Sequence, residues 1–288
     1  MNSSDALTKA FGGGPWLLHA SRSNFVYFDP TRVAKVARPT PHGLAQLENG
    51  VEHAFVLHEF GVPVVLPLLD YVEETALGPT SLWPLVEHVN VTPRTITPTQ
   101  ARELGRVISL VARCNVGVST PWDPFSRVTH RLENSTFPWS TIRRTQKLAE
   151  LVEPMSRLVS GFDYEMAHGD AAISNCLFLA DGSVVLIDLD QSGWRPRHWD
   201  IANLYNNLVI EQDNVQAFVA FLEGHGDVDE VARVGAVMEA ALVKATLTTT
   251  FGLTLEPTPE HISAMRMRLD QMFEWVAGKV PQRLAVID

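Results

Sequence analysis

The sequence contains only two cysteines, Cys114 and Cys176, and they lie far apart in the chain. Two distant cysteines exclude a disulfide framework and a cysteine-based zinc site. We therefore expect both thiols to be reduced and buried in the core.

Long apolar runs are also absent. The segment VPVVLPLL is short and interrupted by proline, whereas a membrane-spanning helix needs roughly 18 apolar residues. The first residues, MNSSDALTKAFGGGPW, lack the basic region followed by an apolar region that marks a secretory signal. We therefore expect a cytoplasmic protein with no membrane partner.

The chain has fewer basic than acidic residues: it contains 23 Lys and Arg and 33 Asp and Glu, which gives a formal net charge of -10. Nucleic-acid binding requires a basic face, so we expect no nucleic-acid partner. A cationic small substrate is compatible with this balance. With 45% hydrophobic residues the chain should fold as an ordinary globular protein, and 288 residues favour two lobes. The oligomeric state stays open.

The amino-terminal part combines strand and helix patterns. The β-rich runs SNFVYFD and RVAKVAR flank the turn signal DPT, which predicts a hairpin. A helix should follow, with Thr40 and Pro41 as N-cap and first residue and Gly61 at its end. Its apolar face would hold Leu44, Leu47, Val51 and Phe55. The runs VVLPLLDYV and SLWPLVEHV predict further strands, completing an antiparallel sheet with one helix packed on it.

Beyond residues 87–91 the pattern becomes helical. Thr97, Pro98 and Gln100 form a capping-box start, and apolar residues recur at helical spacing at Ala101, Leu104, Ile108 and Val111. Further helices are expected over 142–160, 200–222, 228–250 and 258–278. The fold class is therefore α+β, with a small sheet-rich lobe over residues 1–87 and a larger helical lobe over 88–288.

An acid-rich hairpin interrupts the helical part, in the stretch EMAHGDAAISNCLFLADGSVVLIDLDQ. A two-residue turn at Asp181 and Gly182, the favoured type I′ sequence, would place Asn175 directly opposite Asp188. Asp190 would project from the same face as Asp188. Asp170 lies five residues before Asn175, on a loop that enters the same end of the hairpin.

Two carboxylates about 5 Å apart repel by roughly 3 kcal/mol at an effective dielectric of 20, so a cation should lie between them. Oxygen ligands favour Mg2+ over Zn2+, and a site with so few protein ligands is best completed by a nucleotide. The alternative is that Asp181 and Gly182 form a surface turn and the other acids are solvated loop ends.

The stretch HGDAAISN followed by LIDLD resembles the aminoglycoside phosphotransferase and choline kinase family, which shares its two-lobed fold with protein kinases. The resemblance is most specific from His168 to Asp200. It implies that Asp170 is the catalytic base and that Asn175 and Asp188 bind Mg2+. His168 would brace the catalytic loop and Asp200 would tether it. The acid Asp190, where a protein kinase has glycine, is a third candidate metal ligand with an open role.

In the small lobe, the resemblance makes Lys35 the lysine that contacts the nucleotide phosphates. Its partner would be a helix glutamate, with Glu52 preferred and Glu48 open. A loop over the phosphates would present Ser21, Ser23 and Asn24, whereas the glycines 12–14 lack the ending of a P-loop and are interpreted as a flexible lead-in. Backbone groups of a hinge would hold the nucleotide base, at Glu87, His88 and Val89.

The implied reaction transfers the γ-phosphoryl group of ATP or GTP, with Mg2+, to a hydroxyl of a small molecule such as an amino sugar, an aminoglycoside or an amino alcohol. Candidates for the acceptor pocket are Trp194, Trp199, Tyr205, Glu211, Asp213, Phe251 and Trp275. Two alternatives remain: a metal-dependent hydrolase using His168, Asp170, Asp188 and Asp190 around two ions, and a nucleotide-binding pseudokinase without transfer activity.

Overall fold

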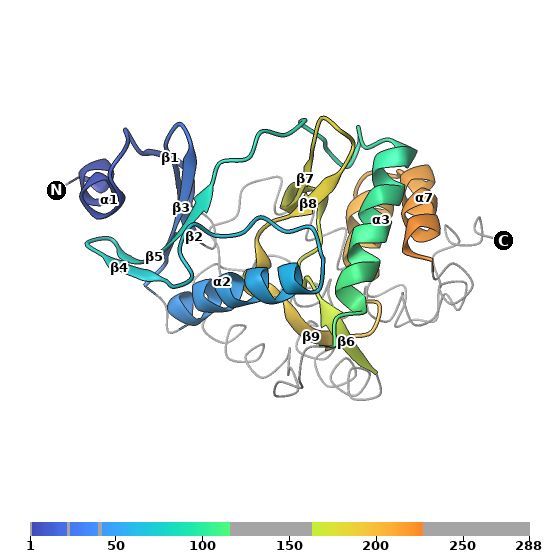
Figure 1. Cartoon of the computed structure of the whole chain (residues 1–288). Coiled ribbons are helices and arrows are strands. Elements are labelled where there is room, and N and C mark those ends of the chain that lie inside the picture. The colour runs from blue at the N-terminus through green and yellow to red at the C-terminus, as the bar shows by residue number, and fades with distance from the viewer. Residues whose placement is uncertain (1, 22–23, 40–41, 116–162, 227–288) are drawn as a thin grey trace, which may run out of the picture.

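The computed structural model of the chain describes residues 2–21, 24–39, 42–115 and 163–226 (Figure 1). A five-stranded sheet with two helices forms one end, and α3 and α7 lie at the other, with two short strand pairs between them. The α+β organisation expected from the sequence is therefore present.

The sheet has the strand order β1-β2-β3-β5-β4, and every pair is antiparallel. Its strands are β1 (Leu17–Ser21), β2 (Asn24–Phe28), β3 (Arg32–Ala37), β4 (Glu73–Thr75) and β5 (Gly78–Pro84). The predicted hairpin is confirmed as β2 and β3. Asp29 shapes its turn, because one carboxylate oxygen accepts the N–H groups of Thr31 and Arg32. Lys35 thus lies on the central strand, opposite Val26 and Ser81.

The glycines 12–14, interpreted from the sequence as a flexible lead-in, are held by contacts with the rest of the sheet-bearing part. They follow a short helix, α1 (Ser3–Phe11), whose Leu7 packs with Trp16 in a small core cluster under the sheet. The Arg32 guanidinium donates to the carbonyls of Phe11 and Gly12 at 2.8 and 2.9 Å while it is paired with Asp29. The positive φ of Gly12 and Gly13 lets the chain turn at this place.

The predicted helix is α2 (Gly43–Glu59), which runs beside the sheet (Figure 1). Its N-cap is His42, two residues after the predicted N-cap Thr40, and Thr40 and Pro41 lie outside the described residues. Leu47 and Val51 are buried as expected, but Leu44 is 44% exposed, so its place on the apolar face was wrong. Leu44 is in the first turn of the helix, before the helix reaches the core.

The run VVLPLLDYV does not form a sheet strand, which corrects the prediction. Val64 instead makes an isolated parallel bridge to Leu186, and the Val65 N–H donates to the Leu186 carbonyl at 3.0 Å. The Leu186 N–H in turn donates to the Pro63 carbonyl at 2.9 Å. Prolines at 63 and 67 remove two N–H donors from this stretch, so a continuous ladder with the sheet is unfavourable.

The helical part begins with α3 (Pro98–Ala112), and its predicted capping box is confirmed, with Thr97 and Gln100 bonded reciprocally. All four of its predicted apolar positions are buried. The predicted helix over 200–222 is broken into α6 (Trp199–Leu204), a π-helical turn (Tyr205–Ile210) and α7 (Val215–His225). The break has a local cause: Asp213 has a positive φ and Asn214 caps a new helix. The other predicted helices lie outside the described residues.

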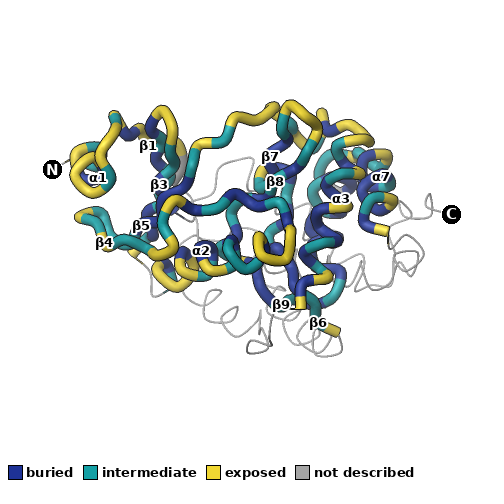
Figure 2. The backbone as a smooth tube through the Cα atoms, in the orientation of Figure 1, coloured by how far each residue is buried: buried dark blue, intermediate teal, exposed yellow. Residues whose placement is uncertain are grey.

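Two strand pairs connect the ends of the molecule: β6 (Tyr164–Ala167) with β9 (Gly193–Pro196), and β7 (Cys176–Phe178) with β8 (Val184–Leu186). Single 3-10 turns, Ile173–Asn175 and Leu189–Gln191, follow β6 and β8. Buried residues of α2, α3, β7, β8 and α7 form one continuous apolar core (Figure 2).

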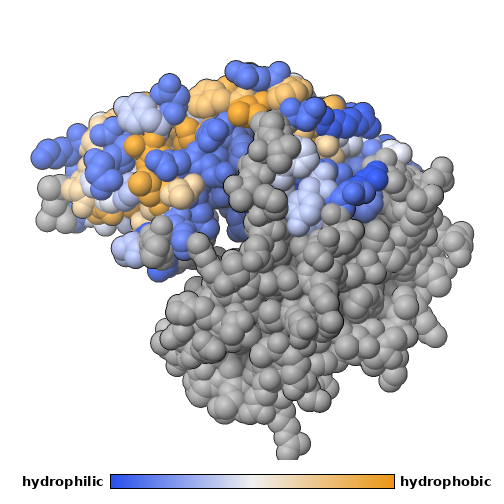
Figure 3. All heavy atoms as spheres, turned by 90° about the horizontal axis from the view of Figure 1, so that it is seen from below, coloured by the Kyte–Doolittle hydropathy of each residue, from blue (hydrophilic) through white to orange (hydrophobic). Residues whose placement is uncertain are grey.

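Both cysteines belong to this core, as predicted. Burial raises the pKa of both thiols, and it raises the pKa of Cys114 to about 11. On the described part of the face seen from below, hydrophilic and hydrophobic side chains are interspersed (Figure 3). Among the described helices, none combines the length and apolarity that crossing a membrane would need.

Candidate functional site

The acid-rich hairpin is shifted by one residue from the predicted register. Cys176 pairs with Leu186 and Phe178 with Val184, and the Ile187 N–H donates to the Asn175 carbonyl at 3.1 Å. Asn175 is therefore opposite Ile187, not Asp188. The cause is the turn: the Asp181 carboxylate accepts the Ser183 N–H and hydroxyl, which makes a three-residue turn over residues 180–182.

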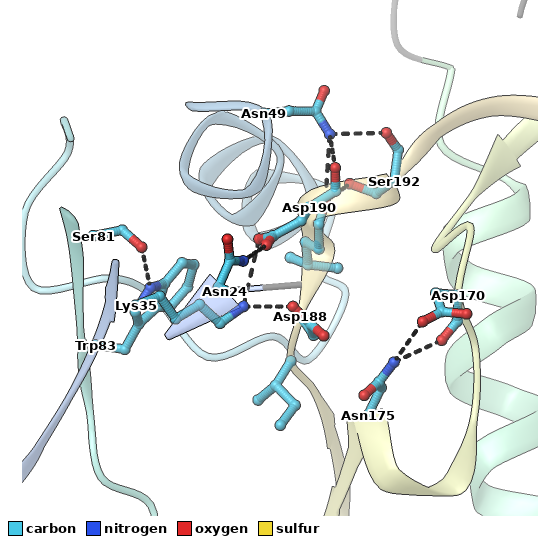
Figure 4. Close-up of polar contacts among 12 residues, drawn as sticks. Asn24, Lys35, Asn49, Ser81, Trp83, Asp170, Asn175, Asp188, Asp190 and Ser192 are labelled. Atoms are coloured by element: carbon cyan, nitrogen blue, oxygen red, sulfur yellow. Dashed lines mark hydrogen bonds and ion pairs between the residues drawn. The ribbon is translucent and has the colours of Figure 1, made fainter. Parts of the chain in front are cut away.

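Asp188 reaches the site in another way. It has a left-handed backbone, with φ 64° and ψ 51°, immediately after the strand pair ends. A non-glycine residue in this region is strained, and such residues gather at functional sites. The turn brings the Asp188 carboxylate within 2.5 Å of the Lys35 ammonium (Figure 4). The sequence register alone could not reveal this conformation.

Asp170 and Asn175 are held together on the loop between β6 and β7. The Asn175 amide nitrogen donates to the Asp170 carbonyl at 2.9 Å and to its carboxylate at 3.3 Å. Because the nitrogen is turned toward Asp170, the amide oxygen of Asn175 stays available to another group (Figure 4).

Asp200 tethers this loop as expected. Its two carboxylate oxygens accept the backbone N–H groups of His168 at 2.6 Å and Gly169 at 3.0 Å. The Trp199 indole donates to the Gly169 carbonyl at 2.9 Å. Gly169 has a positive φ of 85°, and a Cβ there would collide with the Gln191 carbonyl, so only glycine fits.

His168 braces the loop, also as expected. The Asp170 N–H donates to its Nδ1 at 3.3 Å, which leaves the proton on Nε2 to donate to the Ile187 carbonyl at 2.9 Å. The ring is fully buried. One ring nitrogen therefore holds the Asp170 backbone, and the other holds Ile187, the residue before Asp188.

Lys35 makes a second, longer contact with Asp190, at 3.4 Å. Burial by itself would lower the pKa of Lys35, but the carboxylates of Asp190 and Asp188 outweigh it and raise the pKa to about 12. The ammonium also lies 5.5 Å from the centre of the Trp83 ring. Lys35 is therefore a permanently charged cation at the edge of the site.

The expected pair between Lys35 and a helix glutamate is not formed. Glu52 and Glu48 are both exposed, and the ion pairs of Lys35 in the described structure are with Asp188 and Asp190. A helix places residues 48 and 52 on one face, and here that face is turned to solvent. The preference for Glu52 was therefore wrong, and so was the alternative.

Other residues of α2 take the inward face, and sequence reasoning missed them. The Asn49 amide donates to the carbonyls of Asp190 at 3.2 Å and Ser192 at 3.1 Å, and His53 Nδ1 lies 2.8 Å from the Ser192 hydroxyl. An asparagine next to a glycine inside a helix, at positions 49 and 50, was the available signal, because neither residue favours a helix interior.

The hinge is only partly free to hold a base. The Val89 N–H donates to the Phe178 carbonyl at 2.8 Å, so this donor is already used within the protein. The side chains of Glu87 and His88 are exposed, and His88 bonds through its ring to the Val86 carbonyl.

The expected phosphate loop lies between β1 and β2. Ser21 ends β1, Ser23 lies outside the described residues, and Asn24 begins β2. Asn24 is buried, and its amide donates to Asp190 at 2.9 Å. It therefore contacts the site through a carboxylate.

Two acceptor-pocket candidates, Trp199 and Tyr205, are buried core residues, so their proposed place in an open pocket was wrong. Trp194 and Glu211 are half-buried and Asp213 is exposed. Phe251 and Trp275 lie outside the described residues.

The oxygen ligands expected for Mg2+ differ in their accessibility. The Asp188 side chain is 37% exposed and the Asp190 side chain 10% exposed. Among the described residues, no group of three or more His, Cys, Asp or Glu is arranged to hold a metal ion. The Asn175 amide oxygen and the Asp188 carboxylate suit a hard cation such as Mg2+. So small a donor set requires further oxygens, such as those of phosphates.

Comparison with known proteins places these features in context. The family model described as the phosphotransferase enzyme family matches residues 17–234. No curated protein matches the sequence at a significant level.

Several solved structures share the fold. A choline kinase from Streptococcus pneumoniae has a TM-score of 0.72 and 13% identity, covering 94% of this chain and 97% of that one. An amicoumacin kinase in complex with AMP-PNP and Ca2+ has a TM-score of 0.65 and 14% identity over 96% and 94%. An aminoglycoside phosphotransferase from Streptomyces rimosus in complex with ADP and streptomycin has a TM-score of 0.60 and 17% identity, covering 82% of this chain and 96% of that one. The expected two-lobed, protein-kinase-like fold is confirmed.

Proposed function

This chain belongs to the phosphotransferase enzyme family, and from that premise we propose that it is a small-molecule kinase. It transfers the γ-phosphoryl group of ATP or GTP to a hydroxyl of an amino sugar, an aminoglycoside or an amino alcohol. Its relatives by fold include a choline kinase and an amicoumacin kinase, and the complexes of two relatives with AMP-PNP or ADP support the choice of donor.

One observation carries the proposal. Two distant segments of the chain meet at the site, the strand β3 and the stretch from Asp170 to Asp188. Lys35 on β3 contacts Asp188, the neighbouring Ile187 N–H donates to the Asn175 carbonyl, and the Asn175 amide donates to Asp170. Phosphoryl transfer needs mainly such positioning and charge stabilisation.

Asp170 is the proposed base. Its carboxylate orients the acceptor hydroxyl and accepts its proton as the hydroxyl oxygen bonds to the γ-phosphorus. The bond from that phosphorus to the bridging oxygen breaks, and ADP or GDP leaves. The braces from His168 and Asp200 keep the Asp170 loop in place during this step.

Lys35 and the metal ligands bind the donor. The Lys35 ammonium contacts phosphate oxygens, and the Asn175 amide oxygen and the Asp188 carboxylate hold Mg2+. Mg2+, when bound, neutralises phosphate charge. We also propose that the boundary between the two lobes lies near residue 87. The backbone of Glu87 and His88, at this boundary, contributes to binding the nucleotide base.

The alternative of a two-metal hydrolase finds less support. Both nitrogens of His168 are engaged with the backbone, and Asp190 is bonded to Lys35 and Asn24. Neither side chain is free to complete a second metal site. A pseudokinase would have no need of the braced Asp170.

The proposal is tested by measuring ADP and GDP release from Mg2+ complexes of ATP and GTP with a panel of aminoglycosides, amino sugars, choline and ethanolamine. We expect release that depends on one acceptor class and a phosphorylated acceptor in the products. Asp170→Asn should reduce turnover at least 100-fold with nucleotide affinity nearly unchanged. Release of phosphate from simple esters without nucleotide would instead support the hydrolase, and nucleotide binding with no transfer to any acceptor would support the pseudokinase.

A further inference from the structure

The helix α2 supplies no carboxylate to Lys35. Its two candidate glutamates face solvent, and the residue that faces the site between them is Gly50. A Cβ added at Gly50 would lie 2.5 Å from Asp190 Oδ1 and 3.3 Å from the Asp190 backbone nitrogen. Because Gly50 has no side chain, the Asp190 carboxylate can occupy the space beside the helix at this position.

Asp190 uses both of its oxygens on the sheet. Oδ1 lies 3.4 Å from the Lys35 ammonium on β3, and Oδ2 accepts the Asn24 amide on β2 at 2.9 Å (Figure 4). The carboxylate is almost completely buried, whereas the Asp188 carboxylate is more than a third exposed. A buried carboxylate needs such partners, because an unpaired buried charge is strongly unfavourable.

The backbone around Asp190 is fastened to α2. Asn49 donates to the carbonyls of Asp190 and Ser192, and the Ser192 hydroxyl bonds to His53. The segment that carries Asp188 and Asp190 is therefore clamped between the helix and the sheet, and the position of Asp190 does not depend on solvent-exposed contacts.

We propose that Asp190 is the positioning residue for Lys35, in place of a helix glutamate, and that it is not a metal ligand. Asp188 and Asp190, the two acids on this segment, have different roles. Asp188, the more exposed of the two, binds Mg2+, and Asp190 keeps Lys35 in place when Asp188 turns from Lys35 to the metal. This inference rests on the proposed function, since it assigns Lys35 to the nucleotide phosphates.

The test moves the carboxylate from the segment to the helix. The affinity for Mg2+-ATP, measured by calorimetry without acceptor, is compared among the unchanged protein, Asp190→Asn, Asp190→Gly, Gly50→Asp and the double variant Gly50→Asp with Asp190→Gly. Glu52→Gln is the matched control, since it removes one exposed carboxylate from the same helix. Melting temperatures identify any variant that does not fold.

We expect both Asp190 variants to bind Mg2+-ATP at least tenfold more weakly. Gly50→Asp alone should also lose affinity, because its Cβ crowds Asp190. The double variant should recover at least tenfold over Asp190→Gly, because the helix then supplies the carboxylate. Glu52→Gln should match the unchanged protein. A purely structural role of Asp190 would give no such recovery.

Three outcomes would overturn the inference: unchanged affinity in a folded Asp190→Asn, a loss in Glu52→Gln as large as in Asp190→Asn, or no recovery in a folded double variant. Because the readout is nucleotide binding, it is independent of phosphoryl transfer. A protein that binds Mg2+-ATP with these effects but phosphorylates no acceptor would contradict the proposed function alone.

Discussion

At the scale of single residues, the site depends on side chains of one type in different surroundings. Asp188 is strained and half-exposed, Asp190 is buried between the sheet and a helix, and Asp200 accepts two backbone N–H groups. The sequence shows three aspartates close together, but their roles follow from what surrounds each carboxylate.

The role of Asp188 can be separated from that of the fold by Asp188→Asn. Asparagine keeps the size of the side chain and tolerates the left-handed backbone, but it replaces a charged metal ligand by a neutral amide. We expect the Mg2+ concentration for half-maximal ATP binding to rise at least tenfold. Asp181→Asn, the same change at the exposed turn of the same hairpin, is the control. An unaltered Mg2+ dependence in Asp188→Asn would contradict its assignment as a ligand.

At the scale of elements, the packing of α3 against α7 supports the loop that carries Asp170. α3 and α7 approach so closely that a Cβ at Gly105 would collide with the Phe221 carbonyl and one at Gly224 with the Arg102 carbonyl. The π-helical turn before α7 contributes Asn207, whose amide oxygen accepts the Ile173 N–H of the loop at 3.2 Å. Glycine at these two positions therefore fixes how α7, and the turn that precedes it, lie against α3.

Gly105→Ala tests this close approach. The added methyl group must push the two helices apart, and overpacking of this kind costs about 1–3 kcal/mol of the free energy of unfolding. Denaturant unfolding measures the loss, and Gly182→Ala, where a Cβ would meet open space but the positive φ disfavours alanine, separates crowding from backbone strain. A Gly105→Ala protein as stable as the unchanged chain would show that the helices can separate without cost.

At the scale of the whole molecule, the amino-terminal part of the chain and residues 178–190 are joined around the site. The bridge from Val64 to Leu186 and the bond from Val89 to Phe178 join backbone to backbone. Lys35 and Asn24 reach from the sheet to Asp190. A nucleotide bound between Lys35 and Asp188 would add a further link, so binding should stabilise the entire fold.

This link is measured by thermal unfolding with ATP or GTP, with and without Mg2+. A ligand at 100 times its dissociation constant stabilises the native state by about 2.7 kcal/mol. We expect a rise in melting temperature of several degrees that is largely lost when a chelator removes Mg2+. Mg2+ alone is the control, and an equal rise without the metal would contradict the proposed metal-linked nucleotide site.

The sequence by itself determined the features that depend on neighbouring residues. The capping box of α3 and the β2–β3 hairpin were predictable, because their hydrogen bonds join residues a few positions apart. The braced loop from His168 to Asn175 was expected from the family resemblance, because its braces from Ile187 and Asp200 are distant in the sequence. The order of the two parts followed from the change of hydrophobic period.

Only the tertiary structure decided which carboxylate reaches Lys35, how the hairpin before Asp188 is registered and where residues 64–72 pair. A buried cation takes the acid that packing brings within reach, here Asp190 over Gly50, and no spacing along α2 reveals that choice. The register followed from two local hydrogen bonds at the Asp181 turn, which only the folded structure revealed. The other two outcomes are set by packing and desolvation between segments distant in sequence.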